Sequence, residues 1–116
     1  MTKIVYIAGP FRGLTAWDVA CNVHRAEELA FAVAKAGAMP LCPHANTRDF
    51  DGTLTDKFWI DGTLELLRRC DAVIVVPGWE ESTGTRGEIE EAKRIGLSVF
   101  YDQCELRAWL DMVGKK

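Results

Sequence analysis

Hydrophobic positions along this 116-residue chain switch repeatedly between continuous apolar runs and helical spacing. Residues 3–9 (KIVYIAG) are apolar and rich in β-branched side chains, which predicts a buried strand. From 14 to 36, apolar residues recur every three or four positions, which predicts a helix with one apolar stripe. Thr15 and Asp18 have the spacing of a helix cap, and Gly37 is placed to end the helix. The stripe consists of Val19, Val23, Ala26, Ala30 and Val33.

The rest of the chain continues the same alternation. Polar, turn-rich residues 44–56 predict a loop, and its length indicates a functional role. Strands that alternate with helices form a parallel sheet covered on both faces. We therefore expect a single doubly wound α/β domain over residues 1–116, flavodoxin-like or Rossmann-like, with three layers and a parallel sheet of four or five strands. Further strands are predicted at 38–43, 71–77 and 97–102, and further helices at 57–69, 85–95 and 105–113.

Composition and charge narrow the class of protein. Hydrophobic residues make up 48% of the chain and charged residues 27%, which is typical of a soluble globular domain. No apolar run approaches the ~20 residues that span a membrane, and the N-terminal run reads as a strand rather than a signal peptide. The net charge of −3 argues against a nucleic-acid polymer as partner, but not against a small anionic ligand. The four cysteines and two histidines are too scattered for a zinc site, and reduced thiols indicate a cytoplasmic protein without a bound metal.

Three loops are expected where ligands bind in this class of fold, beyond the carboxyl ends of the strands. They span 9–13, 44–56 and 77–85 and contain most of the unusual side chains. The candidate binding residues in them are Gly9, Pro10, Phe11, Arg12, Gly13, His44, Asn46, Gly78, Trp79, Ser82, Gly84 and Thr85.

Several of these candidates also have a purely structural explanation. Glycines let backbone N–H groups approach a ligand and Arg12 offers a forked cation for a phosphate, but an ordinary turn with a surface arginine is the alternative. His44 could bind a phosphate or a base, although a loop histidine beside an Asx turn at Asn46 is the favoured interpretation. Phe11 and Trp79 could stack on a nucleobase or pack in the core or against another subunit.

The acidic residue Glu88 stands out because of its place on the predicted helix at 85–95. At about 100° per residue, it shares a narrow arc with the apolar residues Ala92 and Ile95. Burying a carboxylate is costly without compensation, so this position demands an explanation. On spacing alone, a capping box from Thr85 to Glu88 and a catalytic role explain it equally well. The glycine-bearing loop at 9–13, which also links a strand to a helix, favours the catalytic role.

Three segments together resemble the nucleoside 2-deoxyribosyltransferase family. They are YIAGPFRG (6–13), CDAVIVVPGW (70–79) and STGTRGEIEEA (82–92), and the resemblance covers residues 3–102. It is closest to the deoxynucleoside 5′-monophosphate N-glycosidases and to small bacterial and phage relatives. The most specific part is the GTxxE spacing after a buried strand, which ends at Glu88.

The resemblance implies a role for each of four residues. Glu88 corresponds to the nucleophile that attacks C1′ of the sugar, and Tyr6 to the residue that orients it. Arg12 and Ser82 correspond to residues that hold a 5′-phosphate, although Ser82 also fits a turn or a helix N-cap. The implied activity is cleavage or transfer of the N-glycosidic bond of a nucleoside or nucleoside 5′-monophosphate. It needs no cofactor, and the implied assembly is a homodimer or larger.

One position departs from the family pattern. Thr63 stands where an aspartate usually assists the departure of the base. Asp61 is the nearest candidate acid, although it could equally cap a turn at Gly62. The departure keeps open a different class of protein, a non-catalytic nucleotide-sensing module. The stretch PGWEESTGTRGE is also similar to the motif of cytokinin-activating phosphoribohydrolases, with Trp79 in place of its second glycine.

Overall fold

The structure, a computed structural model of the chain, describes residues 1–47, 50 and 52–114. Every predicted strand and long helix is present, with ends shifted by one or two residues. Within the described ranges, no helix combines the length and the apolarity needed to cross a membrane. The strands are β1 (Ile4–Ala8), β2 (Met39–Leu41), β3 (Ala72–Val75) and β4 (Ser98–Phe100). The helices are α1 (Ala16–Lys35), α2 (Pro43–Asn46), α3 (Asp56–Arg68), α4 (Thr83–Arg94) and α5 (Gln103–Gly114).

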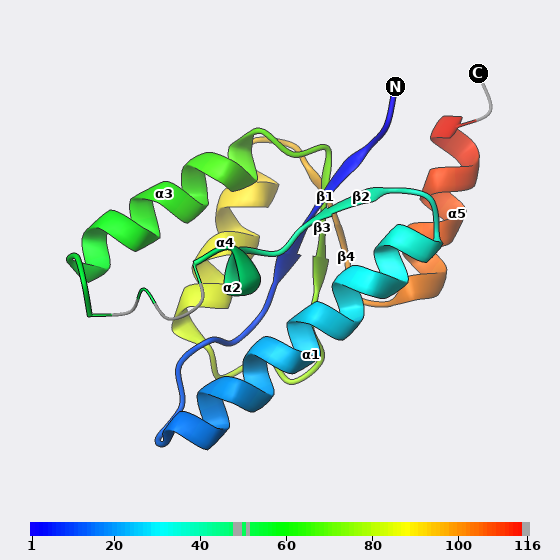
Figure 1. Cartoon of the computed structure of the whole chain (residues 1–116). Helices are drawn as coiled ribbons and strands as arrows, with labels where there is room; N and C mark the ends of the chain where they lie inside the picture. The colour runs from blue at the N-terminus through cyan, green and yellow to red at the C-terminus, as the bar shows by residue number, and fades with distance from the viewer. Residues whose placement is uncertain (48–49, 51, 115–116) are drawn as a thin grey trace.

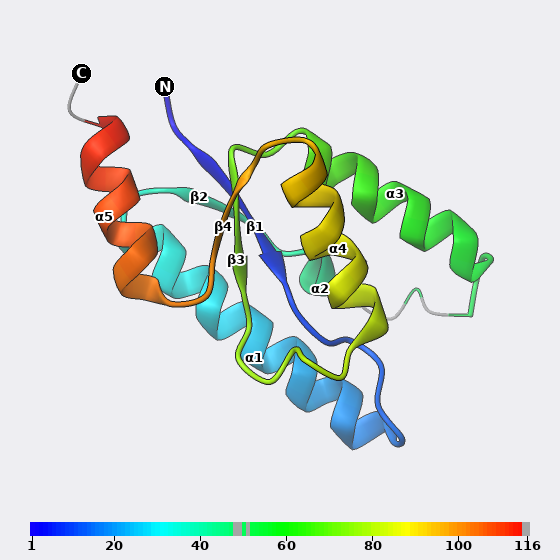
Figure 2. The same ribbon diagram turned by 180° about the vertical axis from the view of Figure 1, so that it is seen from behind.

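The strands form one parallel sheet in the order β2-β1-β3-β4. Helices α1 and α5 cover one face of the sheet, and α3 and α4 cover the other (Figures 1 and 2). The predicted three-layer, doubly wound α/β fold is therefore confirmed, with four strands in the described part of the chain. The strand order reverses between β1 and β3, so a ligand crevice is expected at the carboxyl ends of these two strands.

Alternate residues of β1 point into the two halves of the core. Val5 and Ile7 pack towards α1 and α5, whereas Tyr6 and Ala8 pack towards α3 and α4. All four side chains are fully buried. The hydroxyl group of Tyr6 therefore lies inside the protein, where it requires a hydrogen-bond partner.

Helix α1 is capped as predicted. Thr15 Oγ1 accepts a hydrogen bond from the backbone N–H of Asp18, and Asp18 Oδ2 accepts one from the backbone N–H of Thr15, both at 3.1 Å. Gly37, with φ +104°, follows the end of the helix in the left-handed region that favours glycine. Four of the five residues of the predicted stripe are buried, and Val19 is half-buried.

Two local predictions are wrong. The segment Pro43–Asn46 forms the short helix α2 rather than a loop, because Pro43 occupies a first-turn position where its missing N–H is not needed. The other error concerns α4, which begins at Thr83 rather than at 85 because Ser82 is its N-cap and accepts a hydrogen bond from Thr85 N at 3.2 Å. Residues 48, 49 and 51 of the predicted loop lie outside the described residues.

The close approach of the end of β1 to the segment after β3 can be tested with two glycine substitutions. A Cβ at Gly9 would lie 2.5 Å from Val76 Cγ2 and 2.7 Å from Val76 Cβ, so the backbone must shift. We expect Gly9→Ala to lower the free energy of unfolding by roughly 1–3 kcal/mol. Gly62→Ala, in open space on α3, should instead raise it by about 0.5–1 kcal/mol. Chemical denaturation measures both, and effects of the same sign would contradict the packing described.

Candidate functional site

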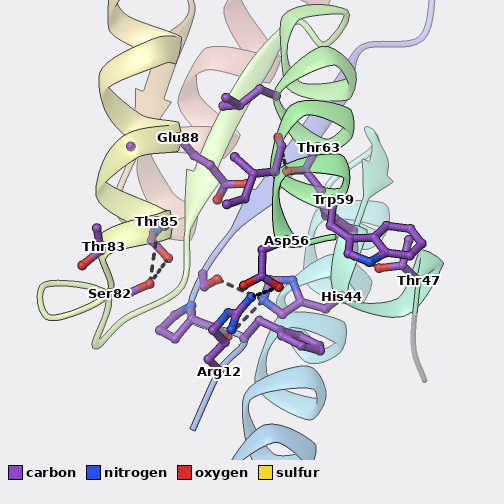
Figure 3. A pocket seen from close by; sticks show the side chains of 18 of the residues that line it. Arg12, His44, Thr47, Asp56, Trp59, Thr63, Ser82, Thr83, Thr85 and Glu88 are labelled. Atoms are coloured by element: carbon purple, nitrogen blue, oxygen red, sulfur yellow. Dashed lines mark hydrogen bonds and ion pairs between the residues drawn. The ribbon is translucent and has the colours of Figure 1, made fainter. Parts of the chain in front are cut away.

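A cavity of about 870 Å³ opens at the carboxyl ends of β1 and β3, at the predicted crevice. Its side chains converge from the loop after β1, from α2, from α3 and from the start of α4 (Figure 3). The volume falls within the range of roughly 300–1,000 Å³ that is typical of small-molecule sites. The lining residues are Gly9, Pro10, Phe11, Arg12, Pro43, His44, Thr47, Phe50, Asp56, Trp59, Ile60, Thr63, Leu64, Gly78, Glu81, Ser82, Thr83, Gly84, Thr85, Gly87 and Glu88.

Glu88 lines this cavity from α4, and its carboxylate is tied to the central strand. Glu88 Oε2 accepts a hydrogen bond from the hydroxyl of Tyr6, 82 residues earlier in the chain. Because Ser82 is the N-cap, Glu88 lies in the second turn of α4 and cannot cap its start. The capping box between Thr85 and Glu88 is therefore wrong. In Figure 3 the Glu88 side chain points from α4 towards α3, where Thr63 lies.

Burial sets the electrostatics of the pair. Burial raises the pKa of Glu88 to about 7, and the hydrogen bond from Tyr6 opposes part of that rise. The pKa of Tyr6 is raised well above its ordinary value, first by burial and then by the charge of the Glu88 carboxylate. Tyr6 is thus a neutral donor, while Glu88 exchanges between its acidic and ionised forms close to neutral pH. A carboxyl group with this pKa can act as a nucleophile or as a base.

His44 is buried on α2 and holds the loop after β1 instead of lying in a loop itself. Its Nε2 lies 3.0 Å from both the Gly9 and the Pro10 carbonyl oxygens. Carbonyl oxygens only accept, so Nε2 carries the proton, and burial lowers the pKa of His44, which keeps the ring neutral. Its Nδ1 is then a buried acceptor, and within the described part of the chain it has no hydrogen-bond partner. The ring centroid of Phe11 lies 6.0 Å from that of His44.

A cation and a helix N-terminus border the same cavity. Arg12 Nη2 lies 2.8 Å from Oδ1 of Asp56, the first residue of α3. At the start of α4, Ser82 Oγ accepts hydrogen bonds from the backbone N–H of Thr85 at 3.2 Å and from its hydroxyl at 2.8 Å. The positive end of the α4 dipole therefore faces the cavity together with the Arg12 guanidinium, an arrangement that favours an anion.

The candidate acid Asp61 does not lie in the cavity. It is exposed on α3 and pairs with Lys57 Nζ at 2.6 Å. Thr63, at the position of the usual aspartate, does line the cavity, and its hydroxyl donates to the carbonyl oxygen of Ile60 at 3.0 Å. The reason is helical spacing, since residues two apart on a helix point to different faces.

Three of the candidate binding residues also lie outside the cavity lining. Asn46 is exposed at the end of α2. Trp79 packs partly buried against the α3–α4 half of the core, and its ring lies 5.8 Å from that of Tyr101. Gly13 has a packing role, since a Cβ there would lie 2.4 Å from Asp18 Cβ.

The wall formed by α3 was missed from the sequence. Ile60, Leu64 and Leu67 recur at helical spacing, but only Leu67 is buried, and the other two line the cavity. Trp59 lines the cavity as well, and its buried Nε1 has no hydrogen-bond partner among the residues that the structure describes. Its ring lies 5.9 Å from that of Phe50. The signal was present, because an aromatic residue and two aliphatic ones share one face of a helix that follows a candidate ligand loop.

Comparison with solved structures identifies the class of fold. The 2-deoxyribosyltransferase of the psychrotolerant bacterium Bacillus psychrosaccharolyticus is similar, with a TM-score of 0.60 and 20% sequence identity. The alignment covers 83% of the present chain and 69% of the Bacillus protein. The 2-deoxyribosyltransferase of Leishmania mexicana has a TM-score of 0.57 and 22% sequence identity, and the alignment covers 84% of the present chain and 61% of the Leishmania protein. The chain therefore has a nucleoside 2-deoxyribosyltransferase-like fold, and it spans less than two thirds of the Leishmania protein.

The sequence places the chain in a family. It belongs to the family described as Domain of unknown function (DUF7768), whose model matches residues 3–102, a range that includes Tyr6 and Glu88. No curated protein sequence matches the chain.

The raised pKa of Glu88 predicts a pH dependence of stability. The folded state holds a proton on this carboxyl between pH 4.5 and about 7, whereas the unfolded chain has lost it. The free energy of unfolding therefore falls as pH rises through this window, by about 3 kcal/mol in total. Glu88→Gln removes this contribution, so its stability relative to the unmodified chain should increase with pH over the same window. Urea denaturation between pH 4.5 and 8 measures the difference, and a difference that does not change with pH would exclude a raised pKa at Glu88.

Proposed function

We propose that this chain cleaves or transfers the N-glycosidic bond of a nucleoside or nucleoside 5′-monophosphate, with Glu88 as the nucleophile. The observation that carries the proposal is the Glu88 carboxyl group, half-buried at the edge of a ligand-sized cavity and hydrogen-bonded by Tyr6. The fold shared with two 2-deoxyribosyltransferases supports the same chemistry. We propose further that the chain acts as a single domain in the cytoplasm, without a metal or cofactor.

The chemistry requires a carboxylate on one face of the sugar. In the proposed reaction, a Glu88 oxygen attacks C1′ while the C1′–N bond breaks, and the base leaves with the electron pair and takes up a proton from solvent. Water or a second base then attacks C1′, gives up a proton to solvent and releases the Glu88 carboxylate. Tyr6 donates to one carboxylate oxygen, which orients the group and leaves the other oxygen for attack. The reactive form is ionised, so the rate should rise with pH through about 7.

The two ends of the cavity suit the two ends of a nucleotide. Arg12 and the Ser82 hydroxyl at the start of α4 supply a cation and a hydrogen-bonding group for a 5′-phosphate. On binding, Arg12 would leave its ion pair with Asp56 and form one with the phosphate. The α3 wall is apolar and aromatic, which suits the face of a nucleobase. The N–H group at Trp59 Nε1 can donate a hydrogen bond to an acceptor atom of the base.

Exposed apolar side chains next to the cavity support a homodimer or larger assembly. Phe50 and Ile60 line the cavity and are 49% and 54% exposed, and Phe58 on the same helix as Ile60 is 54% exposed. Exposed apolar clusters of this kind are typical of protein interfaces.

A non-catalytic nucleotide-sensing module is the second candidate, and one observation favours it. Asp61 lies on the exposed face of α3, and the Thr63 hydroxyl is engaged with Ile60, so neither side chain is placed to protonate a leaving base. Such a module would bind the same ligands without releasing the base.

Release of free base distinguishes the two functions. The purified chain is incubated with ribo- and deoxynucleosides and their 5′-monophosphates, and free base is measured by chromatography. We expect Glu88→Gln to lower the rate by at least about a thousandfold. Glu90→Gln, an exposed glutamate two residues away on the same helix, is the matched control and should keep the rate. Tight binding without release would favour the sensing module, and equal rates in the two variants would refute Glu88 as the nucleophile.

A further inference from the structure

The loop after β1 is held by two side chains that together bind four consecutive backbone carbonyl groups. His44 Nε2 binds the Gly9 and Pro10 oxygens, as described above. Asn22 Nδ2, on α1, donates to the Phe11 oxygen and to the Arg12 oxygen, both at 3.1 Å. Asn22 does not line the cavity and belongs to none of the motifs that point to function.

The orientation of the Asn22 amide is fixed by its other end. Arg25 Nη1, one turn further along α1, donates to Asn22 Oδ1 at 3.4 Å. The oxygen therefore faces Arg25, and the NH₂ group faces the loop. An aspartate at this position would have the same shape, but a carboxylate oxygen would replace the NH₂ group. That oxygen only accepts hydrogen bonds, so it could not bind the two carbonyl oxygens.

These contacts fix the backbone on either side of the Arg12 side chain. All described peptide bonds are trans, so each N–H points opposite to the carbonyl of the residue before it. With the Phe11 and Arg12 oxygens held by Asn22, the N–H groups of Arg12 and Gly13 are directed away from it. A loop ordered in advance loses less conformational entropy when a ligand binds.

We propose that Asn22 is a positioning residue for the phosphate end of the substrate. It acts through the carbonyl groups of Phe11 and Arg12, which hold the guanidinium of Arg12 at the cavity. This inference rests on the proposed function, because it takes a nucleoside 5′-monophosphate as the ligand whose phosphate Arg12 meets. It assigns to Asn22 a contribution to phosphate affinity, and none to the reaction at C1′.

The test compares ligands with and without the phosphate. The probes are the four common deoxynucleoside 5′-monophosphates and their nucleosides, measured by calorimetric titration and, where base is released, by KM and kcat. With Asn22→Asp, we expect the Kd and KM of the monophosphates to rise about tenfold, since two hydrogen bonds are lost. The values for the nucleosides should not change, and kcat should stay within about twofold. Asn22→Ala, which introduces no charge and suits a helix, should show the same selective loss if Asn22→Asp does not fold.

His24→Gln is the matched control, because His24 is exposed on the same helix and pairs only weakly, at 3.7 Å, with Glu28. It should leave every constant unchanged. The inference is overturned if the affinity for nucleosides and for monophosphates falls equally, or if neither Asn22 variant loses affinity. It is also overturned if the unmodified chain binds both classes of ligand equally well. If the unmodified chain releases no base, the proposed chemistry fails, but a selective loss of monophosphate binding would still uphold the role of Asn22.

Discussion

The hydrogen bond from the Tyr6 hydroxyl to the Glu88 carboxylate joins the central strand of the sheet to the helix that borders the cavity. Tyr6 is fully buried because β1 is covered on both faces, so its hydroxyl needs an acceptor inside the protein. Glu88 is half-buried, and its carboxylate has lost part of its contact with water, so a donor inside the protein stabilises it. The contact satisfies both groups, and it lowers the pKa of a carboxyl that burial alone would raise further. One interaction therefore affects the stability of the fold, the charge of the site and its proposed chemistry.

The rest of the structure keeps the two walls of the cavity in place around this pair. Glu91, one turn after Glu88, accepts hydrogen bonds from Arg68 of α3 at 2.7 Å and from Arg94 at 2.6 Å, which ties α4 to the helix on the opposite wall. On the other side, His44 and Asn22 hold the loop after β1 by its carbonyl groups. These contacts come from four different helices, and each fixes an element that contributes a side chain to the cavity. A site ordered in this way is suited to binding a ligand without a large rearrangement.

Local patterns predicted the fold and the position of the site, whereas contacts between distant residues escaped prediction. The β-branched runs and the helical stripe of α1 identify the elements, and alternation of strands with helices identifies the parallel sheet and its ligand edge. The burial of Glu88 followed from its arc on α4, but its partner Tyr6 came only from family resemblance, since no local rule links residues 82 positions apart. Asp61 was wrongly placed in the crevice because the face of α3 that meets the cavity depends on how α3 packs. Asn22 gave no signal, because its function depends on carbonyl groups, which every residue has.

The ionisation of Glu88 is the property that tests this account most directly. The side-chain carboxyl carbons of glutamate, labelled with ¹³C, can be followed by NMR as the pH is changed, and Glu88→Gln identifies the signal of Glu88. We predict a midpoint near pH 7 for Glu88, and a higher midpoint in Tyr6→Phe, since the hydrogen bond that favours the ionised form is lost. A midpoint near 4.5 that does not move in Tyr6→Phe would mean that Glu88 is solvated and not held by Tyr6, and it would contradict the account.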